Sequence, residues 1–194
     1  MVKMAILAFL FSAAFDADQL VERLTEKYEN IHSVHAHLTQ VYRWEGFDAT
    51  QSFQGEIWLQ KPDRVRIRLN DGQENHIIAC ADTTWLYTPG LNQAILTRHP
   101  SEVLLEIFNF DDYQTTVNVA EDYLLEMVPR EENPYFERLS LHVERDGLLI
   151  RQMTVIDANG NETDWLFDEI ELNPELPDGL FRFSPPEGVE VIEQ

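Results

Sequence analysis

Residues Arg64 to Leu69 read Arg-Val-Arg-Ile-Arg-Leu and constrain the fold more than any other part of the chain. Side chains of a strand point alternately to its two faces, so the three arginines share one face and Val65, Ile67 and Leu69 share the other. The arginine face can stay in water, whereas the aliphatic face has to be covered. The segment therefore predicts a sheet with one apolar face, and what covers that face decides the function.

Strand patterns recur along most of the chain and are separated by turn sequences such as Asn70-Asp71-Gly72, Asp146-Gly147 and Asn159-Gly160. Because sequential hairpins place neighbouring strands side by side, the pattern predicts an antiparallel meander. The segments expected to form strands are 31–42, 53–60, 65–69, 76–81, 85–87, 94–97, 138–145, 148–156 and 163–172.

Two segments, residues 16–30 and 100–110, have apolar residues at helical spacing instead. The side chains expected on their apolar sides include Leu20 and Leu24 in the first segment and Leu104 and Phe108 in the second. Together with the strands they predict an α+β fold, in which helices lie on one face of a large antiparallel sheet. Such a fold is either a filled core or an open barrel that holds a ligand.

The formal net charge is −21, from 35 acidic and 14 basic residues. A surface of this sign repels nucleic-acid phosphates and anionic lipid headgroups, so nucleic-acid binding is not expected. The only cysteine, Cys80, has no partner for an intramolecular disulfide. At 194 residues, of which 44% are hydrophobic, the chain is long enough for one domain with a sizeable core.

The first 14 residues have the outline of a secretory signal peptide. Lys3 supplies a positive charge, residues 5–14 form an apolar run, and Ser12 and Ala14 are small residues at the positions before a cleavage site. A run of ten residues is too short to span a bilayer. We therefore expect the mature domain to comprise residues 15–194.

Catalytic and metal-binding motifs are weak in this sequence. His35 and His37 share one face of a strand, which is a workable metal spacing, but no carboxylate or cysteine nearby in the sequence completes a ligand set. Surface histidines are the favoured interpretation, and no metal site is predicted. The sequence has no Gly-x-Ser-x-Gly elbow, no His-Glu-x-x-His motif and no phosphate-binding glycine loop.

Several segments together resemble the LolA family of outer-membrane lipoprotein carrier proteins. They are 55–62 (Gly-Glu-Ile-Trp-Leu-Gln-Lys-Pro), 85–89 (Trp-Leu-Tyr-Thr-Pro), Gln93-Ala94, 35–40 (His-Ala-His-Leu-Thr-Gln) and 181–189 (Phe-Arg-Phe-Ser-Pro-Pro-Glu-Gly-Val). Each segment alone is unspecific, whereas their order and spacing are characteristic. The match spans nearly the whole of residues 15–194.

The resemblance implies an unclosed antiparallel β-barrel, which is a large twisted sheet, with an α-helical lid over its apolar concave face. It implies a soluble periplasmic chaperone, expected to be monomeric and non-catalytic and to use no cofactor. Such a protein takes the acyl chains of lipoproteins from an inner-membrane ABC transporter and delivers them to an outer-membrane receptor. Two alternatives remain: a periplasmic lipid-binding or sensor domain that does not shuttle lipoproteins, and a hydrolase or lipid-modifying enzyme that uses His35 or His37.

The resemblance also suggests roles for individual residues. Family members usually carry an arginine before the proline, and this arginine tethers the lid. This chain has Lys61 there, which offers a point charge instead of a bidentate fork. A further difference is Asp82-Thr83, where the family has an Asp-Gly turn. The cavity wall is expected at Leu59, Val65, Ile67, Leu69, Ile78 and Ile95, and the lid at Leu20, Leu24, Leu104 and Phe108. For each wall residue, an ordinary packed core is the alternative.

Overall fold

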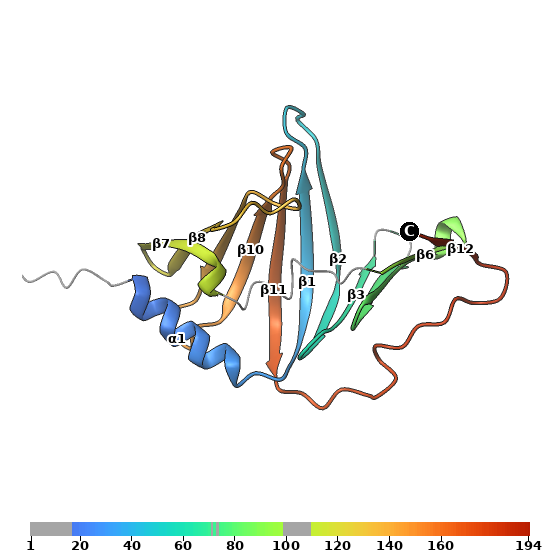
Figure 1. Cartoon of the computed structure of the whole chain (residues 1–194), viewed down its shortest axis with the longest axis horizontal. Coiled ribbons are helices and arrows are strands. Elements are labelled where there is room, and N and C mark those ends of the chain that lie inside the picture. Colours follow the sequence, from blue (N-terminus) through green and yellow to red (C-terminus); the bar gives the residue numbers. More distant parts are fainter. Residues whose placement is uncertain (1–16, 71, 73, 99–109) are drawn as a thin grey trace, which may run out of the picture.

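The chain folds around one large, strongly curved sheet with an α-helix against its inner face (Figure 1). The computed structural model describes residues 17–70, 72, 74–98 and 110–194. Within them the elements are α1 (Ala17–Glu29), β1 (Ser33–Arg43), β2 (Thr50–Gln60), β3 (Arg64–Asn70), β4 (Glu74–Cys80), β5 (Thr83–Thr88), η1 (Pro89–Leu91), β6 (Gln93–Thr97), η2 (Phe110–Asp112), β7 (Tyr113–Val119), β8 (Tyr123–Pro129), β9 (Arg138–Val143), β10 (Ile150–Ile156), β11 (Glu162–Leu172) and β12 (Glu190–Glu193).

Twelve strands of the described residues form the sheet, in the order β12-β6-β5-β4-β3-β2-β1-β11-β10-β9-β8-β7. Two meanders, β1 to β6 and β7 to β11, meet where β1 pairs with β11. All pairs are antiparallel except β12 with β6. β7 and β12 are the two edges, so the sheet is an unclosed barrel and the predicted fold is confirmed. The sequence predicted one antiparallel meander, whereas the structure has two that are joined side by side.

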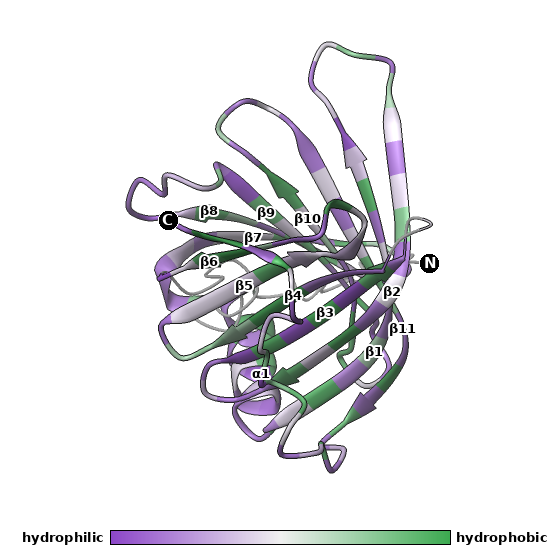
Figure 2. Cartoon of the chain, turned by 90° about the vertical axis from the view of Figure 1, so that its right-hand side faces the viewer, coloured by the Kyte–Doolittle hydropathy of each residue, from purple (hydrophilic) through white to green (hydrophobic). Residues whose placement is uncertain are grey.

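The two faces of the sheet differ as the alternation in β3 predicts. Val65, Ile67 and Leu69 are at most 9% exposed and lie on the inner face, while the arginines between them point outward. Register extends the inner face across the neighbouring strands, because Ile67 pairs with Ile57 on one side and Ile77 on the other. Figure 2 shows the resulting alternation of hydrophilic and hydrophobic residues along the strands.

Gly55 permits the close approach of β2 to β3. A Cβ atom at this position would overlap the carbonyl oxygen of Arg68 and come within 2.8 Å of its carbonyl carbon. Any other residue would therefore push the two strands apart. In the register of the inner face Gly55 lies between Leu38 and Leu69.

The predicted helix over residues 16–30 is confirmed as α1, and the predicted strands lie at or near their expected positions. β7 and β8 lie within residues 113–129, for which no individual strand was predicted. The C-terminal arm, residues 173–194, adds a further unpredicted strand, because β12 pairs in parallel with β6. Three expectations concern residues outside the described part of the chain: the signal peptide at 1–14, most of the helix at 100–110, and the lid residues Leu104 and Phe108.

Candidate functional site

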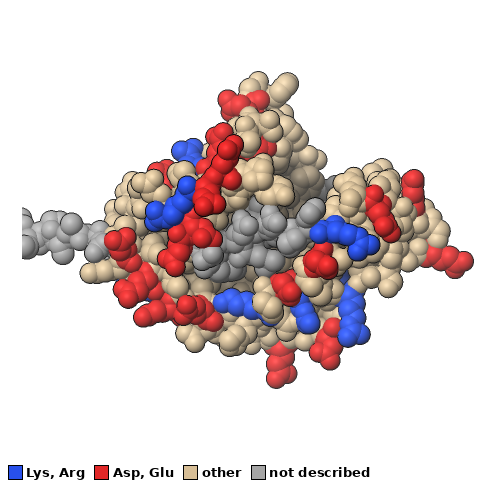
Figure 3. Space-filling view, viewed as in Figure 1, with Lys and Arg blue, Asp and Glu red and all other residues tan. Residues whose placement is uncertain are grey.

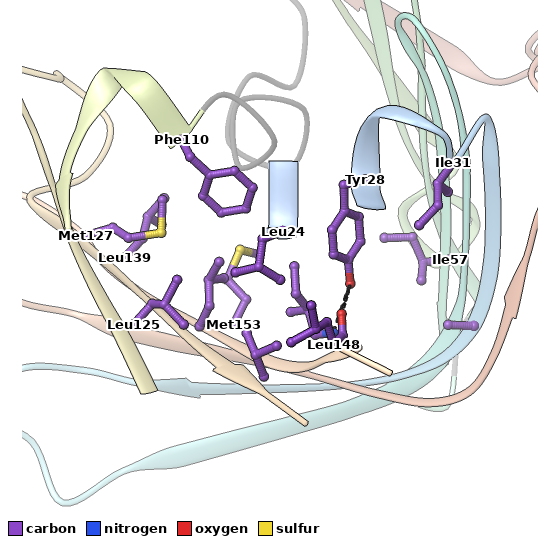
Figure 4. Packing of buried hydrophobic residues seen from close by; sticks show 14 of the residues in the cluster. Leu24, Tyr28, Ile31, Ile57, Phe110, Leu125, Met127, Leu139, Leu148 and Met153 are labelled. Carbon is purple, nitrogen blue, oxygen red and sulfur yellow. Dashed lines mark hydrogen bonds between the residues drawn. The ribbon is translucent and has the colours of Figure 1, made fainter. Parts of the chain in front are cut away.

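α1 covers part of the inner face with one side of its surface. Leu20 and Leu24 are fully buried and Tyr28 is 5% exposed, and they follow one another at helical spacing of four residues. In Figure 4, Leu24 points toward Met153, Leu125 and Phe110, while Tyr28 lies nearer Ile57 and Ile31. The predicted lid residues Leu20 and Leu24 thus lie between the helix and the sheet.

Beside Tyr28 the packing under α1 leaves an apolar cavity of about 60 Å³. Its lining comes from β1, β2, β10 and β11, so it lies where the two meanders join. The side chains that form it include Val34, Ala36, Ile57, Leu59, Met153 and Phe167. A space of this kind, without ionisable groups other than the Tyr28 phenol, suits a hydrocarbon chain better than water.

The predicted wall residues divide between the two faces of the sheet. Leu59 lines the cavity itself, and Val65, Ile67 and Leu69 belong to the buried cluster that continues from it. Ile95 lies on the same face farther away, opposite Leu86, which is 40% exposed.

The prediction for Ile78 is wrong. Ile78 pairs with Arg66 and Trp85, so it points to the outer face, whereas its neighbour Ile77 points inward. Ile78 is nevertheless buried because the C-terminal arm crosses the outer face beside it. The arm is held at this place by Arg66, the pairing partner of Ile78, which donates a hydrogen bond to the carbonyl oxygen of Leu180 at 2.7 Å. The apolar run 77–79 fits either register, so the sequence alone did not distinguish Ile77 from Ile78.

The predicted cavity wall included no residue of β10 or β11, although both strands contribute to the cavity. Met153, Phe167 and Ile170 line the cavity although they are distant from β2 in the sequence. A signal was present in the two apolar pairs at alternate positions, Trp165 with Phe167 and Ile170 with Leu172. Only the pairing of β1 with β11 brings them beside Ala36 and Leu59.

Lys61 lies at the C-terminal end of α1, where helix carbonyl groups lack intrahelical donors. Its Nζ donates to the carbonyl oxygen of Tyr28 and lies 3.5 Å from that of Glu29. Partial burial lowers the pKa of Lys61, and the Glu29 carboxylate opposes this effect. A cation at this end also interacts favourably with the helix dipole. The geometry therefore places Lys61 where a tether for α1 would have to be.

A second set of contacts joins α1 to the loop between β9 and β10. The Tyr28 hydroxyl accepts a hydrogen bond from the backbone N–H of Ile150 at 2.9 Å and lies 3.4 Å from the carbonyl oxygen of Leu148. Lys27 donates to the carbonyl oxygen of Gly147. Burial raises the pKa of Tyr28 to about 12, so the phenol stays neutral at physiological pH.

The outward-facing arginines of β3 have different partners. Arg68 forms ion pairs with Glu56 on β2 and, at 3.6 Å, with Glu74 on β4, so both of its partners are acids of neighbouring strands. Arg66 is bonded to the C-terminal arm instead, and Arg64 donates to the Gln60 side chain at 3.0 Å.

The histidines considered for metal binding or catalysis lie on the outer face. His35 is 3.2 Å from Glu56 and stacks on Trp58, with ring centroids 5.1 Å apart. His37 is 3.6 Å from Glu169. In the described part of the chain, no group of three or more His, Cys, Asp or Glu is placed to hold a metal ion. Nor does any helix in these residues have the length and apolarity needed to cross a membrane.

The large open sheet, the helix against its apolar face and the small apolar cavity between them place the protein in a class of open-barrel domains with an apolar interior. The family model of the outer membrane lipoprotein carrier protein LolA matches residues 29–184, and the chain belongs to this family.

Relatives and solved structures agree with this assignment. The chain is 27% identical to the outer-membrane lipoprotein carrier protein of Azotobacter vinelandii, with 98% of this chain and 96% of that protein covered. It is 26% identical to the carrier protein of Legionella pneumophila strain Paris, with 97% of each covered. A LolA superfamily protein from Nitrosomonas europaea has the same fold, with a TM-score of 0.51 at 14% identity over 88% of this chain and 99% of that one.

Proposed function

We propose that this protein is a periplasmic chaperone that binds the acyl chains of lipoproteins on the inner face of its sheet. The observation that carries the proposal is the apolar cavity between α1 and the sheet, where strands of both meanders meet. Membership of the lipoprotein carrier family supports it. The protein would take its cargo from an inner-membrane ABC transporter and pass it to an outer-membrane receptor, acting as a monomer.

The energetics favour such a site. Removing an acyl chain from water stabilises a complex by about 0.8 kcal/mol per methylene, so a chain of about 15 methylenes contributes roughly 12 kcal/mol before costs. A cavity of about 60 Å³ holds only a small part of such a chain. Loading therefore requires α1 to leave the inner face, and the cost of this opening keeps the affinity low enough for release.

Catalysis is not part of this proposal. A hydrolase that used His35 or His37 would need these side chains beside the bound chain. In β1 they alternate with Val34 and Ala36, which line the cavity, so they lie on the opposite face. This arrangement disfavours the hydrolase alternative.

Binding of a fluorescent fatty-acyl probe to the purified domain tests the proposal. Ile67→Glu is expected to abolish binding, because it places a carboxylate among buried aliphatic groups of the inner face. Asn70→Glu is the matched control, since it adds the same charge at an exposed position of the same strand. Unchanged binding by Ile67→Glu would contradict the proposed site.

Ile67→Glu can also prevent folding, so a second variant keeps the test informative. Ala36→Val adds apolar volume at the wall of the cavity and suits a strand. It is expected to stay folded and to bind the probe more weakly. A lipid-binding or sensor domain would bind the probe equally well, but would fail to extract a lipoprotein from membrane vesicles and pass it on.

A further inference from the structure

Phe47 lies at the tip of the hairpin between β1 and β2, and 74% of its surface is exposed. Trp44 is 37% exposed and packs edge-on against Tyr42, with ring centroids 4.6 Å apart. This hairpin projects beyond the rest of the sheet, beside the hairpin between β10 and β11 (Figure 1). An aromatic side chain so exposed contributes little to the core, and aromatic residues are enriched at binding hot spots.

The tip is held in a fixed position by the neighbouring hairpin. The Asp157 carboxylate accepts hydrogen bonds from the backbone N–H groups of Asn159 and Asn161 at 2.8 and 2.9 Å. The Asn161 side-chain oxygen in turn accepts the backbone N–H of Glu45 at 3.1 Å. An exposed anchor that is already ordered loses less conformational entropy on binding than a free loop.

Charge indicates the kind of partner. A groove of about 420 Å³ separates the two tips, and Glu45, Asp48 and Glu162 line it together with the two aromatic residues. The cation of this groove, Arg43, is already paired with Glu162 at 2.5 Å and with Asp164 at 2.6 Å. Acidic side chains also mark the upper projection in Figure 3. The exposed surface around the aromatic residues is therefore negative.

These features favour a protein partner over a membrane. Insertion into lipid would dehydrate Glu45 and Asp48 beside Phe47, and an anionic bilayer would repel them. A protein surface can instead offer an apolar pocket for the ring and lysine or arginine side chains for the carboxylates. We propose that residues 44–48 form a docking knob for a protein whose apolar pocket is rimmed by basic residues.

The test uses the full chain with the photoreactive residue p-benzoylphenylalanine in place of Phe47, in cells of the producing organism. Cross-linked peptides are then sequenced by mass spectrometry. The expected adduct is one protein segment with apolar residues flanked by lysine or arginine. Asp48→Asn in the same chain is expected to lower its yield, as is high salt, because both weaken the attraction.

Tyr135 provides a matched control position. It is 52% exposed and lies in a loop with Glu131 and Glu132, so it is also an aromatic residue in an acidic setting. The proposal is overturned if position 47 gives no protein adduct, gives lipid adducts, gives the same adducts as position 135, or captures a segment without basic residues.

A second measurement separates docking from cargo binding. In the native chain, Phe47→Ser is expected to lower formation of the complex with the captured protein about tenfold. Binding of the fatty-acyl probe should not change, because Phe47 is outside the cavity lining. If Phe47→Ser forms the complex as well as the native chain does, the docking knob is overturned. If the native chain does not bind the fatty-acyl probe at all, only the proposed function is overturned.

Discussion

Replacing Tyr28 by phenylalanine removes a single oxygen atom from the contact between α1 and the loop that precedes β10. The N–H of Ile150 loses its acceptor at 2.9 Å, and the weaker contact with the Leu148 carbonyl at 3.4 Å disappears as well. A buried amide without an acceptor costs about 1–2 kcal/mol. The closed arrangement of α1 should be destabilised by that amount, which is about a tenfold change in the ratio of closed to open molecules.

Tyr28→Phe is therefore expected to lower the free energy of unfolding and, at the same time, to raise the apparent affinity for a fatty-acyl probe about tenfold. The opposite signs arise because α1 competes with the acyl chain for the inner face. Chemical denaturation and probe titration measure the two quantities. Tyr135→Phe, at an exposed position, serves as control. If Tyr28→Phe binds the probe no better than wild type, α1 is not displaced by the ligand and the reasoning fails.

The same hydroxyl predicts a dependence on alkaline pH. Burial raises the pKa of Tyr28 to about 12 from 10.0, so the folded protein keeps this proton when the unfolded chain has lost it. Stability should be fully present below pH 10 and fall as pH rises toward 12, by about 1.4 kcal/mol per pH unit. This contribution should be absent in Tyr28→Phe. Equal pH profiles for the two proteins would contradict the burial of the phenol.

Three further substitutions test other parts of the account. Gly55→Ala should destabilise the fold by about 3 kcal/mol in a denaturation experiment, because the added Cβ overlaps the Arg68 carbonyl, and a wild-type midpoint would contradict the close approach. Lys61→Met should weaken the closed state by about 1 kcal/mol and strengthen probe binding, whereas Lys61→Arg should not. Burial raises the pKa of Asp164, but hydrogen bonds from Thr154 and Arg43 outweigh it, so the net pKa is lowered. Asp164 therefore contributes stability above pH 4 that is lost at lower pH, and Asp164→Asn should abolish this dependence.

The sequence was most informative where one face of a strand or helix is apolar and the other is not. Arg64 to Leu69 had only one register that buries its aliphatic side chains, and the structure has that register. The helix with Leu20 and Leu24 was equally clear, because both residues lie on one side. In these cases the cost of exposing the apolar face selects a single arrangement.

The sequence was least informative where both faces of a strand are covered, or where the strands that pair are distant in the sequence. β4 is apolar on both sides because the buried core lies on one side and the C-terminal arm on the other, so Ile77 and Ile78 were interchangeable. The cavity residues Met153 and Phe167 depend on the pairing of β1 with β11, which no local turn signals. Long-range pairing of this kind is decided by the whole sheet.

The central claim is that an acyl chain occupies the inner face in place of α1. Nuclear Overhauser effects between a bound fatty acid and the protein test it directly, because they connect acyl protons only to side-chain protons that lie in contact with them. The claim predicts such contacts with the inner-face side chains of Ile57 and Phe167, with loss of the hydrogen bond between Tyr28 and Ile150. Contacts confined to the outer-face side chains of His35 and Trp58, with α1 unchanged, would contradict it.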